Sequence, residues 1–94
     1  MLSEAHRERP VLSAYVATIR VRPKAEVRDP QGEAIGGALR SLGMEVADVR
    51  TGKVIVVRFT ADSSGEAQAT ATRMGDELLA NPVIEEFEIE VTTE

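Results

Sequence analysis

The side chains that could do chemistry in this 94-residue sequence are few and far apart. There is one histidine, His6, and no cysteine, so neither a Ser/His/Asp set nor paired metal ligands can be assembled. His6 lies in a stretch of mixed charges, where a general base would have no partner to position it. The sequence therefore predicts no catalytic residue and no metal site within this chain.

The polar residues held closest to expected turns are Asp29, Asp48, Arg50 and Lys53. Arg50 and Lys53 flank the Thr51-Gly52 pair, and two cations beside a glycine turn could hold an anion. Two cations at a turn are also common on solvated surfaces. Both interpretations remain open from the sequence.

Length and composition indicate one small domain. A chain of this size can bury a two-layer core but no large enclosed substrate cavity, which argues against a self-sufficient enzyme. Hydrophobic residues make up 43% of the chain. They form no run near eighteen residues and no leader, so we expect a cytoplasmic protein without a membrane partner.

Charge is distributed unevenly along the chain. Residues 1–61 carry ten Lys/Arg and seven Asp/Glu, whereas residues 62–94 carry one and nine. The aromatic residues are Tyr15, Phe59 and Phe87. Nucleic-acid binding usually needs a basic footprint and stacking platforms, so we expect no nucleic-acid partner.

The first strand is predicted over Ser13–Arg22, where polar and apolar residues alternate. Residues 1–12 before it mix charges without a period, and we expect a frayed tail followed by one domain over residues 13–94. Pro23 ends the strand. The face expected to be buried carries Tyr15, Ala17, Ile19 and Val21.

A helix is predicted from Asp29, a good N-cap, and Pro30, the favoured first helical residue, to Gly43. Its expected buried stripe consists of Ile35, Ala38, Leu39 and Leu42. Its interior glycines cost roughly 0.8–1 kcal/mol each relative to alanine. We therefore expect a close backbone approach at Gly36 and Gly37, either by the chain's own sheet or by a partner chain.

The central stretch, residues 46–59, has the highest density of β-branched residues. Four consecutive aliphatic residues, Val54–Val57, predict a strand that is apolar on both faces and central in its sheet. Thr51-Gly52 allows either a tight hairpin between two strands or a bend in one strand. The hairpin is the favoured interpretation.

A second helix is predicted from the Ser63-Ser64-Gly65-Glu66 capping box to about Ala80, where Asn81-Pro82 stops it. Its expected apolar side consists of Ala67, Ala71, Met74 and Leu78. The last strand is predicted over Val83–Val91. On that strand Phe87, Ile89 and Val91 alternate with Glu86, Glu88 and Glu90.

These elements predict an α+β fold, a two-layer sandwich with the ferredoxin-like order strand-helix-strand-strand-helix-strand and an antiparallel sheet. Right-handed crossovers place the first strand between the third and the fourth. Arg20 and Arg22 would then face the glutamates of the last strand. The opposite sheet face would expose Val16, Val54 and Val56, which we expect to be a homo-oligomer interface.

Three segments of the sequence resemble the PurS family, the small accessory subunits of phosphoribosylformylglycinamidine synthase. They are Asp29-Pro30-Gln31-Gly32, Asp48-Val49-Arg50-Thr51-Gly52-Lys53 and Leu78-Leu79-Ala80-Asn81-Pro82-Val83-Ile84-Glu85. The resemblance covers about residues 14–91. Family members begin near the first strand, so the first twelve residues are an addition.

The resemblance implies a noncatalytic part in purine biosynthesis. In that family PurS dimerises and bridges a large synthetase subunit, PurL, and a glutaminase subunit, PurQ. The complex uses ATP and magnesium, and the small subunit itself binds no cofactor. We expect partner contacts at Asp29, Pro30, Gln31, Gly32, Arg50, Thr51, Gly52 and Lys53.

Two other functions compete with this one. A small dimeric ligand-binding regulatory module of ferredoxin-like fold would bind an effector at its dimer interface. A small acylphosphatase-like enzyme would need a glycine-rich phosphate loop after the first strand, and Arg22-Pro23-Lys24-Ala25 lacks those glycines. Fold alone separates none of these functions.

Overall fold

The structure is a computed structural model that describes residues 12–94. The tail expected over residues 1–12, His6 included, lies outside the described part apart from Leu12. The elements follow in the order β1 (Ser13–Pro23), α2 (Pro30–Ser41), β2 (Lys53–Ala61), α3 (Ser64–Met74), the π-helical turn η1 (Gly75–Leu79) and β3 (Glu85–Thr93).

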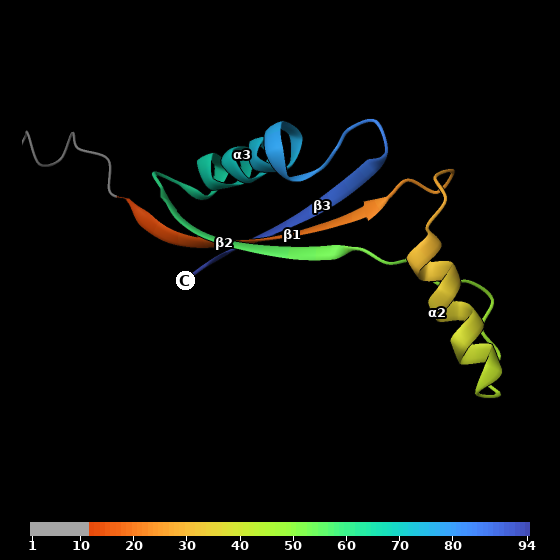
Figure 1. Cartoon of the computed structure of the whole chain (residues 1–94). Helices are drawn as coiled ribbons and strands as arrows, with labels where there is room; N and C mark the ends of the chain where they lie inside the picture. Colours follow the sequence, from red (N-terminus) through yellow and green to blue (C-terminus); the bar gives the residue numbers. More distant parts are fainter. Residues whose placement is uncertain (1–11) are drawn as a thin grey trace, which may run out of the picture.

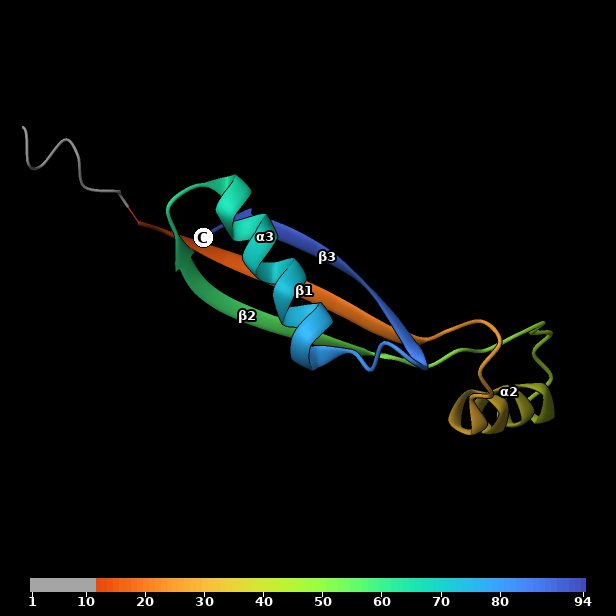
Figure 2. The ribbon, with the colours of Figure 1, turned by 90° about the horizontal axis from the view of Figure 1, so that it is seen from above.

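The sheet is antiparallel with the strand order β2-β1-β3. Ile19 of β1 is paired with Ile55 on one side and with Ile89 on the other. α3 lies across one face of this sheet (Figure 2). The α+β class, the two layers and the inner place of the first strand are confirmed. Within residues 12–94, every helix is too short or too polar to span a bilayer.

The core lies between β1 and α3. Ile19 is fully buried, and Ala71 packs beside it from the helix. Tyr15 and Phe59 extend the core toward the start of α3, with ring centroids 6.2 Å apart. Alternation along β1 thus puts the predicted residues inside.

The prediction for the central stretch is wrong in two respects. β2 is an edge strand, and the region before it, residues 42–52, forms neither a helix nor a strand, so there is no hairpin at Thr51-Gly52. The physical reason is competition for backbone groups. Arg40 of α2 donates to the carbonyl oxygen of Val46, and Asp29 accepts from the N–H of Thr51, so α2 takes groups that a hairpin would pair.

α2 stands beyond the end of the sheet instead of on it (Figure 1). Its expected buried stripe is therefore wrong, since Leu42 is 73% exposed and Ile35 is 39% exposed. The buried positions are Gly32 and Gly36. A Cβ on Gly36 would contact the Val49 side chain, so the glycine face packs against the segment that returns to β2 and not against the sheet. We call residues 29–51 the arm.

The second helix begins as predicted, with the Ser63 hydroxyl accepting from the N–H of Glu66. It ends in the π-helical turn η1, which sequence periodicity did not indicate. The wider turn brings Leu79 against the core and turns Leu78 outward, 82% exposed, so the expectation that Leu78 is buried is wrong.

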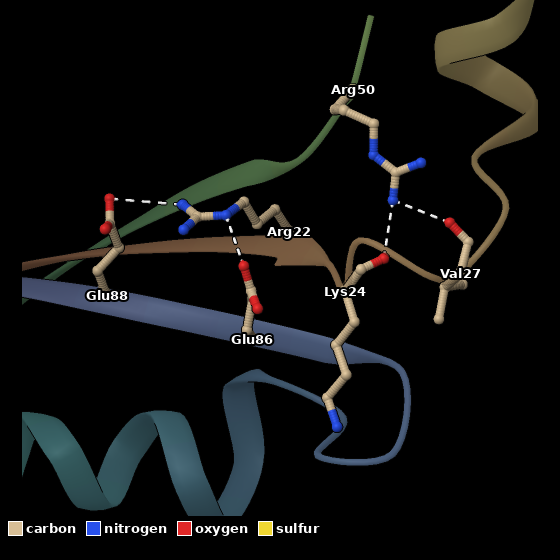
Figure 3. A network of polar contacts seen from close by, with 6 residues as sticks. All are labelled: Arg22, Lys24, Val27, Arg50, Glu86 and Glu88. Carbon is tan, nitrogen blue, oxygen red and sulfur yellow. Dashed lines mark hydrogen bonds and ion pairs between the residues drawn. The ribbon is translucent and has the colours of Figure 1, made fainter. Parts of the chain in front are cut away.

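β3 begins at Glu85, two residues later than predicted, because residues 82–84 form a turn after Asn81. The predicted ladder of opposite charges is confirmed (Figure 3). Arg22 lies 2.9 Å from Glu86 and 3.5 Å from Glu88, and Arg20 lies 3.3 Å from Glu90. These pairs are about half exposed, where ion pairs contribute little stability.

Candidate partner-binding site

The base of the arm is closed by the carboxylate of Asp29, which is buried. One of its oxygens caps α2 by accepting from the N–H of Gly32 at 2.9 Å. The carboxylate also accepts from the backbone N–H of Thr51 at 2.6 Å and from the Thr51 hydroxyl at 2.9 Å. The backbone hydrogen bond from Thr51, and after it the bond from Gly32, lowers the pKa of Asp29. The carboxylate therefore joins the two ends of the arm.

Arg50 fastens the arm from the other side. One of its terminal nitrogens donates to the carbonyl oxygens of Lys24 at 2.9 Å and Val27 at 2.8 Å (Figure 3). Both acceptors belong to the connection between β1 and α2. The guanidinium of Arg50 is thus used within the chain, although the residue remains exposed.

Two glycines allow the closest backbone approaches in this region. A Cβ on Gly32 would overlap the carbonyl oxygen of Val49, and one on Gly52 would overlap the carbonyl oxygen of Val21. Both positions therefore require a residue without a side chain. The first approach seats α2 on the returning segment, and the second seats that segment on the end of β1.

The eight residues predicted to bind a partner fall into two groups. Asp29, Gly32, Arg50, Thr51 and Gly52 form the internal contacts just described. Pro30, Gln31 and Lys53 are exposed. Within residues 12–94, the side chains of Gln31 and Lys53 make no hydrogen bond or ion pair.

The third family-like segment comes to the same end of the sheet. Glu85 pairs with Pro23 across the ladder, and the N–H of Lys24 donates to the carbonyl oxygen of Ile84 at 2.9 Å. A shallow hollow of about 280 Å³ lies where the segments meet. It is lined by Val21, Pro23, Gln31, Thr51, Gly52, Lys53 and Glu85.

We call the residues that line this hollow the end-of-sheet site. Glu85 belongs to the third family-like segment but was not predicted to bind a partner, because its place beside Pro23 depends on strand pairing. The contribution of Lys24 and Val27 was also missed, because they act through backbone carbonyl groups that no side-chain pattern reveals.

The chemistry available at this site is binding. The described residues bring together no group of three His, Cys, Asp or Glu side chains that could hold a metal ion. The hollow is open. Its polar groups are the amide of Gln31, the ammonium of Lys53 and the carboxylate of Glu85, which also accepts from the N–H of Asn81 at 2.7 Å. Such a mixed set suits the polar rim of a protein interface.

The residues predicted for the oligomer interface lie on the bare sheet face. Val54 and Val56 are 60% and 61% exposed, and Val16 is half-buried on the same face of β1, where its partner across the ladder is Arg58. Within residues 12–94, no helix covers this face (Figure 1). The three valines thus lie on one face of the sheet, as predicted, with Arg58 opposite Val16 and Arg20 opposite Val54.

Comparison with known proteins gives the same family that the three sequence segments resemble. Residues 16–93 match the family described as PurS, phosphoribosylformylglycinamidine (FGAM) synthase. The chain belongs to the PurS family. It is 42% identical over 76 residues to the FGAM synthase subunit PurS of Mycobacterium leprae, covering 78% of this chain and 90% of that protein. It is 41% identical over 75 residues to the PurS subunit of Archaeoglobus fulgidus, covering 79% and 94%.

Solved PurS structures have the same fold. PurS from Thermus thermophilus superposes with a TM-score of 0.77 at 42% identity, covering 84% of this chain and 95% of that chain. A chain in the structure of PurLQS from Thermotoga maritima gives 0.78 at 35% identity, covering 84% and 98%. The expectation of a PurS subunit of FGAM synthase in purine biosynthesis is confirmed, and this chain is a subunit and not the whole enzyme.

Proposed function

We propose that this PurS chain bridges the PurL and PurQ subunits of FGAM synthase and contacts a partner through the end-of-sheet site. The observation that carries the proposal is the convergence of three family-like segments, spread over residues 29–85, on one end of the sheet. The internal members hold the shape of that surface. Gln31 and Lys53 within the site, and Pro30 beside Gln31, then supply the contacts.

The experiment that tests this proposal titrates the PurL subunit of the same organism with the double variant Gln31→Ala, Lys53→Ala. Neither side chain holds the arm, so the free energy of unfolding should change by less than about 0.5 kcal/mol. Partner affinity should fall by about tenfold, the equivalent of about 1.4 kcal/mol. Gln68→Ala, on the exposed side of α3, is the control. Wild-type affinity in the double variant would assign the site a purely structural role.

The ATP and magnesium of the synthase reaction are proposed to bind to the other subunits. The donor set supports this, since the described residues gather no metal-binding group of His, Cys, Asp and Glu. Cytoplasm is the proposed location, as for the pathway to which the family belongs.

A second copy of the chain is the other partner that we propose. Two surfaces with exposed apolar side chains favour it. One is the bare sheet face, where Val16, Val54 and Val56 share the surface with the ion pairs of Arg20 and Arg22. The other is the arm, where Leu42 and Met44 are 73% and 53% exposed. A twelve-residue helix with an unburied stripe is marginal in water, so association that covers it would stabilise both copies.

A further inference from the structure

The turn between α3 and β3 exposes three aliphatic side chains for which neither the fold nor the proposed bridge accounts. Leu78 is 82% exposed, Val83 is 76% exposed and Ile84 is 43% exposed. All three belong to the third family-like segment. We call them the turn surface. Figure 1 shows that this turn lies at the same end of the sheet as the arm.

The turn is held firmly by Asn81. The Asn81 side-chain oxygen accepts from the N–H of Val83 at 3.0 Å, and the Asn81 N–H donates to the Glu85 carboxylate at 2.7 Å. The N–H of Glu85 donates back to the Asn81 carbonyl oxygen at 2.7 Å. A preorganised turn loses little conformational entropy when a partner binds, which favours affinity.

The π-helical turn is what exposes Leu78. In a regular α-helix Leu78, four residues after Met74, would lie on the same apolar side of the helix. The extra residue in η1 gives the inward place to Leu79. Single π-turns within helices are frequent at functional sites. Beside this turn lies a second hollow, also of about 280 Å³, in which Ala80, Pro82 and Phe87 supply the apolar lining.

The charge around the turn surface indicates the kind of partner. Acidic residues flank it along the chain. The basic residues beside it are Lys24, whose N–H donates to the carbonyl oxygen of Ile84, and Arg73, which lines a hollow with Leu78. The acidic neighbours are Asp76, Glu77, Glu85 and Glu86. Glu77 is paired with Arg73 and Glu86 with Arg22, so the negative charge is only partly compensated. A complementary partner carries an apolar side chain flanked by basic residues.

We propose that the turn surface docks a segment of a PurL or PurQ subunit in which an aliphatic or aromatic side chain is flanked by Lys or Arg. The inference rests on the proposed bridging function. It also extends the end-of-sheet site, because Glu85 lines both hollows. The apolar side chain packs on Leu78 and Val83, while the basic groups face the acidic rim.

The test measures binding of the full chain to purified PurL and PurQ, separately and together, by calorimetry. The double variant Leu78→Ser, Val83→Ser should weaken binding to one of them by about tenfold or more, as expected for anchor residues. Leu12→Ser, which is 60% exposed at the far end of β1, is the matched control and should bind as the wild type does. Asp76→Asn should reduce the salt dependence of the same titration.

The outcomes separate this inference from the proposed function. If the wild type binds and the double variant binds equally well, the inference is overturned and the bridge stands. If the wild type binds neither subunit, both are overturned. Loss of self-association in sedimentation, with partner binding intact, would assign the turn surface to a second copy and overturn the inference. If the double variant melts several degrees below the wild type, the same binding measurement is made with the single variant Leu78→Ser.

Discussion

The carboxylate of Asp29 and the main-chain and side-chain donors of Thr51 form the contact on which the arm depends. The two residues are 22 positions apart, yet the backbone N–H of Thr51 lies 2.6 Å from Oδ2 of Asp29, and the hydroxyl lies 2.9 Å from the same oxygen. The same carboxylate caps α2 through Gly32. One side chain therefore both starts the helix and ties down the segment that returns from it.

Thr51→Val should lower the free energy of unfolding by roughly 1.5–3 kcal/mol, the range for a hydrogen bond to a charged group. The substitution keeps the shape of the side chain and removes only the hydroxyl donor. Thr60→Val on the outer face of β2 is the control and should change stability by less than about 0.5 kcal/mol. Equal urea midpoints for both variants would show that the hydroxyl contributes nothing.

The stability of the chain should fall in acid through Asp29. Hydrogen bonds from Thr51 and Gly32 lower the folded-state pKa of this carboxyl. Its contribution is therefore fully present above the pKa of an unfolded aspartate, about 3.9, and is lost as the pH falls through the folded value. Urea unfolding of wild type and Asp29→Asn at about pH 6 and about pH 3 measures this. The gap in stability between the two proteins should narrow at the lower pH, and a constant gap would exclude this linkage.

Much of the fold followed from local patterns in the sequence. Alternation gave β1, the Ser63 cap gave the start of α3, and the glutamates of β3 lie opposite Arg20 and Arg22. The position of α2 did not follow, because the stripe of Ile35 and Leu42 shows which side is apolar but not what covers it. Residues 46–50 form the first strand in the hairpin interpretation, but the carbonyl oxygens of Val46 and Ala47 accept from Arg40 of α2 instead.

The candidate site was only partly predictable for a similar reason. Asp29 was identified as a helix cap, but its bond to Thr51 depends on tertiary structure. The outward turn of Leu78 depends on a single inserted residue in η1, which an apolar pattern with a 3.6-residue period cannot reveal.

Gly75→Ala should destabilise the protein by roughly 1–3 kcal/mol, the cost of overpacking a filled core. A Cβ at this position would overlap the ring of Phe87. Gly37→Ala should instead stabilise the protein. Nothing lies near its Cβ position, and alanine is favoured over glycine in a helix interior by roughly 0.5–1 kcal/mol. Thermal melts of the two variants should therefore move in opposite directions. A stable Gly75→Ala protein would mean that η1 shifts to accept the methyl group.

Val56→Glu should split the proposed homo-oligomer, since it replaces one of the exposed valines of the bare sheet face with a charge. Burying an unpaired charge costs several kcal/mol, enough to dissociate a micromolar dimer. Sedimentation equilibrium of the variant and of Thr60→Glu, a charge of the same kind farther along β2, gives the comparison. An unchanged oligomer in Val56→Glu would remove this face from consideration and leave the arm as the contact.

The most direct test of the account is the rate of FGAM formation from formylglycinamide ribonucleotide, ATP and glutamine by the chain's own PurL and PurQ subunits, measured with and without this chain. We predict no turnover by this chain alone. Adding it to PurL and PurQ should raise the glutamine-dependent rate until the binding sites are filled. Turnover by the isolated chain, or a rate unaffected by its addition, would contradict the conclusion that it acts as a noncatalytic bridging subunit.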